Sequence, residues 1–144
     1  MADEMSGHCL CGAVTITVAG HGGFTGACHC RMCQRWSGAL FVCFNAPAKG
    51  VTVTGPVARY PSSAFAERVF CPTCGSHLWV RNTDRDDAPY DLMPGLFDAA
   101  RDIPLTSEIY TDRALPGLAL SGDHRRATRA EYEAKNHHLD GDMP

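Results

Sequence analysis

The sequence lacks the features that define several large protein classes. Its longest apolar runs fall far short of the roughly 20 residues that a bilayer-spanning helix needs, and its first residues are polar and acidic rather than an apolar secretory leader. With 13 Lys and Arg against 16 Asp and Glu, its net charge is −3, so it offers no broad basic surface for DNA or RNA. We therefore expect a protein without a membrane or nucleic-acid partner.

The composition is otherwise that of an ordinary folded chain. A length of 144 residues, 44% of them hydrophobic, suits one compact domain. Beyond Gly122 the chain becomes polar, and Thr128–Lys135 has helical composition. We accordingly assign residues 1–122 to the domain and residues 123–144 to a polar C-terminal tail or peripheral helix.

Cysteine is the residue type that is distributed most unevenly. Seven of the eight cysteines fall into three tight groups, which are Cys9 and Cys11, then Cys28, Cys30 and Cys33, and then Cys71 and Cys74. Zinc takes about four ligands in a tetrahedron with Zn–S near 2.3 Å, so its ligand sulfurs lie within roughly 4 Å of one another. Cysteines two or three residues apart meet that requirement, and we expect reduced, metal-bound thiols in the cytoplasm.

Counting the ligands divides the cysteines into two sites. A structural zinc site has about four protein ligands, whereas a catalytic one keeps about three and an open position. The two pairs together make a closed site, and the triplet of Cys28, Cys30 and Cys33 makes an open, catalytic one. Gly12 and Gly75 follow the two pairs directly, where a tight turn brings backbone N–H groups near the sulfurs.

Two alternatives remain open at this point. The even number of cysteines is compatible with disulfides, although a chain of this length has less need of them and C-x-C disulfides are strained. Cys43 could also complete the triplet as a second closed site, but it lies in an apolar strand pattern and is interpreted as a small core residue.

The regular elements are predicted from periodicity and turn residues. A short helical turn, Met32–Trp36, follows the triplet and ends at Ser37–Gly38. The predicted strands are Ala13–Val18, Ala39–Asn45, Val51–Thr54, Val57–Tyr60, Ala66–Phe70, His77–Val80, Tyr90–Leu96 and Glu108–Tyr110.

Three residues near the triplet are candidates for further roles. Arg31 and Arg35 are four residues apart, so they share a helix face and could attract an anionic ligand, although solvated arginines are the simpler interpretation. His29 lies between two ligand candidates, and in an extended segment it points away from them. We expect His29 to form a supporting hydrogen bond rather than to ligate the metal.

These motifs resemble those of a known family. The segments GHCLCGAV at 7–14, CHCRMC at 28–33 with Gly38 and Phe41, and FCPTCGSHL at 70–78 resemble the glutathione-dependent formaldehyde-activating enzyme family, which includes centromere protein V. The similarity extends from about Gly7 to Tyr110. Three ordered motifs at such spacing are a specific signal.

The resemblance implies a fold, two metals and an activity. The fold would be mainly β, of the β-tent type, with small antiparallel sheets built around a structural zinc site. The structural zinc falls on Cys9, Cys11, Cys71 and Cys74, and the second on Cys28, Cys30 and Cys33. Family members are described as carbon–sulfur lyases that condense glutathione and formaldehyde reversibly to S-(hydroxymethyl)glutathione.

The sequence also departs from the family pattern. The late strand has the sequence Glu108–Ile109–Tyr110, and the later stretch Leu115–Leu118 has no tryptophan, which bears on glutathione specificity. The polar tail has no counterpart in the family.

The expected function is therefore that of a lyase-like enzyme that forms or cleaves an S-hydroxymethyl thiol adduct. Its partners would be a small-molecule thiol and an aldehyde, with Arg31 and Arg35 on the substrate's carboxylates and a homodimer as the possible assembly. The alternative functions are glutathione or thiol binding without turnover, and a purely structural zinc module.

Overall fold

A computed structural model describes residues 4–139 of the chain, which divide into two compact units. Unit 1 contains residues 4–24 and 43–104, and unit 2 contains residues 25–42 and 105–139. Each unit is thus built from two separate pieces of the chain. The boundary between residues 42 and 43 falls within a strand, β4 (Phe41–Ala46).

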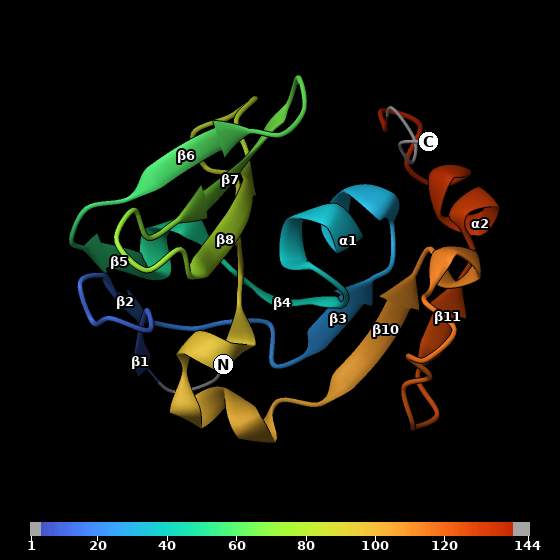
Figure 1. Ribbon diagram of the computed structural model, residues 1–144, viewed down its shortest axis with the longest axis horizontal. Helices are drawn as coiled ribbons and strands as arrows, with labels where there is room; N and C mark the ends of the chain where they lie inside the picture. Colours follow the sequence, from blue (N-terminus) through green and yellow to red (C-terminus); the bar gives the residue numbers. More distant parts are fainter. Residues whose placement is uncertain (1–3, 140–144) are drawn as a thin grey trace. The chain divides into compact units, whose positions relative to one another are not determined.

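Unit 1 is an antiparallel β structure (Figure 1). Its strands are β1 (Met5–His8), β2 (Thr15–Val18), β5 (Val51–Thr54), β6 (Ala58–Pro61), β7 (Ala66–Phe70), β8 (His77–Asn82) and β9 (Tyr90–Leu92). Short 3₁₀ turns are η1 (Ala48–Gly50), η2 (Pro94–Leu96) and η3 (Asp98–Asp102). One sheet has the order β1-β2-β5, and β4-β9-β8-β7-β6 pair in a second series.

Alternation in β2 explains how unit 1 obtains its core. Ile16 and Val18 are fully buried while Thr15 between Val14 and Ile16 is exposed, as the period-2 pattern predicts. Burying each such branched side chain contributes roughly 1.5–3 kcal/mol of hydrophobic stabilisation. The core cluster continues through Phe44, Val69, Leu78, Trp79, Leu92 and Phe97 and includes two cysteines, Cys9 and Cys71.

Unit 2 has parallel strand pairs, which the sequence analysis did not predict. Its elements are β3 (Thr25–Cys28), α1 (Arg31–Ser37), β10 (Leu105–Ile109), the 3₁₀ turn η4 (Thr111–Arg113), β11 (Arg125–Ala127) and α2 (Arg129–Glu133). β10 pairs in parallel with β3 on one side and with β11 on the other. The carboxyl ends of these three strands therefore lie at one edge, and α1 and α2 begin there, with α2 beside β11 (Figure 1).

The observed elements are mainly β, as predicted. α1 ends at Ser37 and is capped by Gly38, which has a left-handed φ of 94°, in agreement with the predicted end of the helical turn. The predicted strand Tyr90–Leu96 is too long, because β9 ends at Leu92 and Pro94 begins a 3₁₀ turn. Proline has no N–H group to donate to a sheet, which accounts for the early end.

Candidate functional site

The two cysteine pairs meet in unit 1. The sulfurs of Cys9, Cys11, Cys71 and Cys74 all lie within 4.8 Å of one another. Cys9 Sγ is 3.6 Å from Cys11 Sγ, and Cys11 Sγ is 3.8 Å from Cys71 Sγ, although 60 residues separate the latter two in the chain. Tetrahedral Zn–S bonds of about 2.3 Å require sulfurs roughly 3.8 Å apart. Four thiols at this spacing therefore fit a closed zinc site.

Each pair lies in a tight backbone turn, of four residues at Cys9–Gly12 and of five residues at Cys71–Gly75. Gly12 N donates to Cys9 O at 3.1 Å, and Gly75 N donates to Cys71 O at 2.9 Å. Both glycines have left-handed φ angles, 81° and 77°, which other L-residues adopt at a cost. These glycines allow each chain segment to turn within one cysteine pair.

Polar groups around Cys9 and Cys74 favour the thiolate form that zinc binds, whereas burial and the neighbouring thiols raise the pKa of Cys11. The Val14 N–H lies 3.3 Å from Cys9 Sγ, and Ser76 Oγ lies 3.2 Å from Cys74 Sγ. The hydroxyl and backbone of Ser76 lower the pKa of the Cys74 thiol to about 5. Ser76 Oγ also accepts a hydrogen bond from Leu10 N at 3.0 Å, which ties the two turns together.

The cysteine triplet lies in unit 2, at the carboxyl edge of its parallel strands. Cys28 ends β3, Cys30 is the N-cap of α1, and Cys33 lies in the first turn of that helix. The three sulfurs lie within 4.8 Å of one another, and the Cys33 N–H donates to Cys30 Sγ at 3.3 Å. Cys28 and Cys30 are half-buried, whereas Cys33 is buried. The end of β3 and the start of α1 thus bring three thiols together.

The charge balance of the triplet suits a bound cation. Hydrogen bonds with Cys30 and Cys33, then burial, and last the repulsion between neighbouring thiolates raise the pKa of the Cys28 thiol well above its ordinary value. A divalent cation would remove that repulsion and hold the sulfurs as thiolates. The donor set, three soft sulfurs, is one that zinc accepts. Within the described part of the chain, this cluster therefore offers a metal three ligands, Cys28, Cys30 and Cys33.

A buried polar network lies behind the triplet. His29 is fully buried, and its Nε2 is 2.7 Å from Glu108 Oε1. The other carboxylate oxygen, Oε2, lies 2.5 Å from His124 Nε2 and accepts from Arg126 Nε at 3.1 Å. The predicted hydrogen-bonding role of His29 is confirmed, but its partner Glu108 is 79 residues away and was not predicted. A charged residue that faces inward from a strand was the one available signal.

Tyr110, which was predicted as the last residue of a strand, is not part of one. It follows β10 with φ 57° and ψ 41°, the only non-glycine residue described with positive φ, and such a conformation is costly. Its buried hydroxyl donates to Glu133 Oε2 at 2.8 Å. Burial, followed by Glu133 and by the thiols of Cys30 and Cys28, raises the pKa of Tyr110. Tyr110 is therefore close enough to the triplet to sense its charge.

The sequence also singled out Arg31, Arg35 and Cys43, and none of them belongs to either cysteine cluster. Arg31 and Arg35 are exposed on α1, one turn apart, and their contact with a substrate stays a prediction. Cys43 is half-buried in β4 and belongs to neither cluster of metal-capable residues in the part of the chain described.

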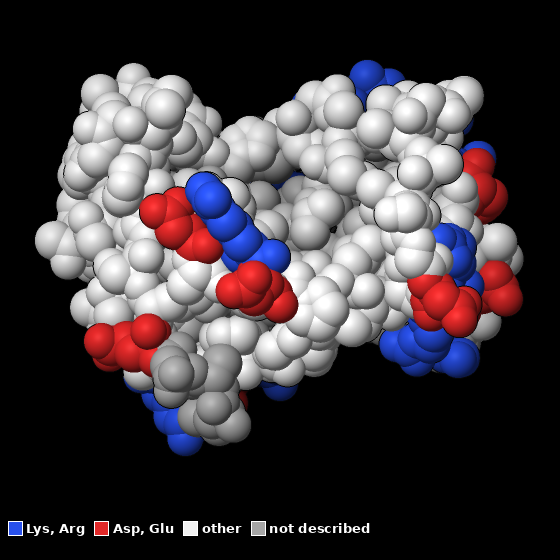
Figure 2. Space-filling model, turned by 90° about the horizontal axis from the view of Figure 1, so that it is seen from below, with Lys and Arg blue, Asp and Glu red and all other residues white. Residues whose placement is uncertain are grey.

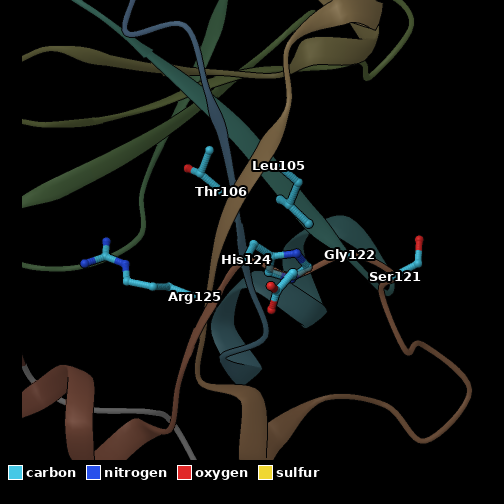
Figure 3. Close-up of a pocket in the computed structure, with 7 residues that line it drawn as sticks. Leu105, Thr106, Ser121, Gly122, His124 and Arg125 are labelled. Carbon is cyan, nitrogen blue, oxygen red and sulfur yellow. The ribbon is translucent and has the colours of Figure 1, made fainter.

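Unit 2 also has a surface hollow. It is lined by Leu105, Thr106, Ser121, Gly122, Asp123, His124 and Arg125. The residues come from the start of β10 and from the segment that leads into β11 (Figure 3). The side chain of His124 is only 3% exposed although it lines the hollow, so this ring joins the surface to Glu108.

On the face shown in Figure 2, acidic and basic side chains are interspersed in small groups. Within residues 4–139, no helix combines the length and the apolar character that crossing a bilayer would require.

Comparison with known proteins identifies the family of the chain. Residues 4–113 match the model for GFA, the glutathione-dependent formaldehyde-activating enzymes. The chain belongs to the GFA family. A relative from Schizosaccharomyces pombe, named as an uncharacterized lyase, is 32% identical over 110 residues, which are 76% of this chain and 80% of that protein.

A solved structure agrees with the fold. A crystal structure of a Rhodobacter sphaeroides protein is 26% identical, covers 71% of this chain and all of that one, and has a TM-score of 0.56. The GFA match includes all seven clustered cysteines but ends at Arg113. The residues that follow, including His124, Arg126 and Glu133, lie outside the matched region.

Proposed function

We propose that this GFA-family protein is a zinc-dependent carbon–sulfur lyase that forms or cleaves S-(hydroxymethyl)glutathione. In this proposal the fold is of the β-tent type, and one zinc binds the four thiols of unit 1 while a second binds the triplet. The observation that carries the proposal is the difference between the two clusters, four converging sulfurs in one and three in the other. A three-donor set leaves about one of the four usual zinc positions for a substrate.

The proposed reaction is an addition without a redox step. The glutathione sulfur forms a bond to the formaldehyde carbon, the carbonyl π bond opens, and the thiol proton ends on the oxygen. The lyase direction reverses each of these changes. Zinc at the triplet would supply a positive charge that favours the thiolate form of a bound thiol.

The residues of the chain would supply position and charge. Cys28, Cys30 and Cys33 would hold the zinc at the edge of the strands. Holding the two reactants in place is itself a large part of catalysis. The exposed guanidinium groups of Arg31 and Arg35, one turn apart on α1, can bind the carboxylates of glutathione. A homodimer and a cytoplasmic location stay predictions.

A triplet variant tests the proposal most directly. We expect native mass spectrometry to count two zinc ions in the parent and one in Cys30→Ser, with thermal stability close to the parent. NMR follows the exchange of ¹³C-formaldehyde with S-(hydroxymethyl)glutathione, and the spontaneous rate is subtracted. The remaining rate should fall at least about 100-fold in Cys30→Ser, because one of the ligands is lost. Cys43→Ser is the matched control and should keep both zinc ions and the activity.

Other outcomes would favour the alternatives. Bound glutathione without accelerated exchange would indicate a thiol-binding protein. One zinc and no thiol adduct in the parent would indicate a structural module.

A further inference from the structure

The segment of residues 120–133, here called the C-terminal segment, follows the region matched by the family. It pairs with β10 through β11 and makes two sets of side-chain contacts near the end of β10. The first set is made with Glu108. Both of its carboxylate oxygens are hydrogen-bonded, one to His29 and the other to His124 and Arg126. Arg126 in turn donates to the carbonyl oxygens of Leu120 and Gly122 at 3.0 Å each, which holds the loop before β11.

The second set is made with Tyr110. Its hydroxyl donates to Glu133 of α2, and its ring centroid lies 5.7 Å from that of Tyr132. Arg129 Nε lies 3.3 Å from Glu133 and pairs with it one helical turn away. Glu133 of the C-terminal segment thus binds the residue that has the left-handed conformation.

β10 links these contacts to the segment that carries Cys28 and Cys30. Ile109 pairs with Cys28 in the parallel register, and the His29 N–H donates to Ile109 O at 3.0 Å. The buried His29 ring is fixed by Glu108. His29, between Cys28 and Cys30, is thus held through its main chain by Ile109 and through its side chain by Glu108. Both of these residues belong to the strand that the C-terminal segment contacts.

Charge burial suggests that more than packing is involved. Glu108 is 5% exposed, and a buried carboxylate is costly unless it is paired and hydrogen-bonded. A purely structural strand could place an apolar residue at this position at lower cost. Substituting a residue that holds metal ligands in place commonly lowers metal affinity by about 10- to 100-fold.

We propose that the C-terminal segment is a positioning element of the triplet: Arg126, acting through Glu108 and His29, and Glu133, acting through Tyr110, hold Cys28 and Cys30 in their metal-binding geometry. The inference rests on the proposed function, because it takes zinc to be bound by the triplet. None of these residues is assigned to the chemical step, and none touches the sulfurs in the contacts described above.

Two neighbouring arginines of β11 provide the test. Zinc transfer from the full-length protein to a chromogenic chelator is followed, and the triplet phase is defined as the one that Cys30→Ser lacks. We expect Arg126→Gln to release that zinc at least about 10-fold faster, while zinc of the four-thiol site in unit 1 and the thermal midpoint change little. Arg125→Gln alters the adjacent residue, which is exposed, and should match the parent.

A second pair of variants keeps the test decisive if Arg126→Gln does not fold. Glu133→Ala and Arg129→Ala both remove the pair between these two residues, but only Glu133→Ala removes the acceptor of the Tyr110 hydroxyl. Faster triplet release and a lower kcat are expected for Glu133→Ala alone. Equal release rates in Glu133→Ala, Arg129→Ala and the parent would overturn the inference. A parent without any triplet phase would contradict the proposed function itself, and the inference with it.

Discussion

Gly75 illustrates at the residue scale how a turn limits the choice of side chain. Its φ of 77° is left-handed, and a Cβ there would meet nothing within 4 Å, so a substitution is opposed by backbone conformation rather than by a clash. We expect Gly75→Ala to lower the free energy of unfolding by about 1–2 kcal/mol. Urea unfolding measures this change. Gly95→Ala, also in open space but without a left-handed φ, is the control and should cost clearly less.

Glu108 makes stability depend on pH. Burial raises the pKa of its carboxyl, but hydrogen bonds from His124 and His29 outweigh burial and keep the pKa below its ordinary value of 4.5. A carboxyl with a lowered folded-state pKa stabilises the fold above its unfolded pKa, and this contribution is lost as the pH falls through the folded-state pKa. The parent should therefore lose stability below about pH 4.5 more steeply than Glu108→Gln.

Urea unfolding from about pH 6 to pH 3 measures this difference. At the upper end Glu108→Gln should be less stable than the parent by roughly 1–3 kcal/mol, because Arg126 and His124 lose a charged acceptor. At the lower end the two proteins should converge. Parallel curves across the range would show that the carboxyl does not titrate differently in the folded protein.

Local residue chemistry explains which parts of the site could be predicted. The cysteine groups were predictable because each group is close in sequence, and ligand counting alone separated four from three. The partner of His29 was not, because Glu108 is 79 residues away and is brought there by strand pairing. The conformation of Tyr110 was not predictable either, since nothing in its residue type favours positive φ.

At the scale of elements, most strands of unit 1 were predicted, including β7, which has no alternation, whereas β1, β3 and β11 were not. β2 has alternating valine, isoleucine and threonine residues and was placed correctly, whereas β1, Met5–His8, has a glycine at one of its two buried positions and was missed. The parallel pairing of β10 with β3 and β11 depends on contacts between distant parts of the chain, which the strand sequences alone do not specify.

The cap of α2 allows a prediction for a single element. Thr128 accepts from the Glu131 N–H at 3.2 Å, and the Glu131 side chain accepts from the Thr128 N–H at 2.9 Å, a complete capping box. A helix of five residues is too short to be stable alone. Thr128→Ala should destabilise α2 by about 1 kcal/mol, seen as faster amide exchange at residues 129–135. Ala130→Ser, inside the helix but outside the cap, should change exchange much less.

At the scale of the whole molecule, the order of the chain assigns a joining role to the four-thiol site. Unit 1 takes its cysteine pairs from two separate pieces of the chain, and Cys11 and Cys71 lie 3.8 Å apart across 60 residues. A metal bound there would close that long loop, and the free energy of metal binding would become part of the free energy of folding. The triplet lies within six residues of one piece and closes no such loop. Losing a ligand should therefore lower the stability of the fold at the four-thiol site and change it little at the triplet.

This difference predicts the outcome of a third cysteine substitution. Cys71→Ser removes a buried ligand from the loop-closing site, and we expect a loss of several kcal/mol in stability, visible as a fall in Tm of at least about 10 °C. Removing zinc from the parent with a strong chelator should reproduce the fall, and Cys43→Ser, which changes a cysteine outside both clusters, should not. An unchanged Tm in Cys71→Ser would mean that the four thiols do not carry the folding metal, and unit 1 would then depend on its apolar core alone.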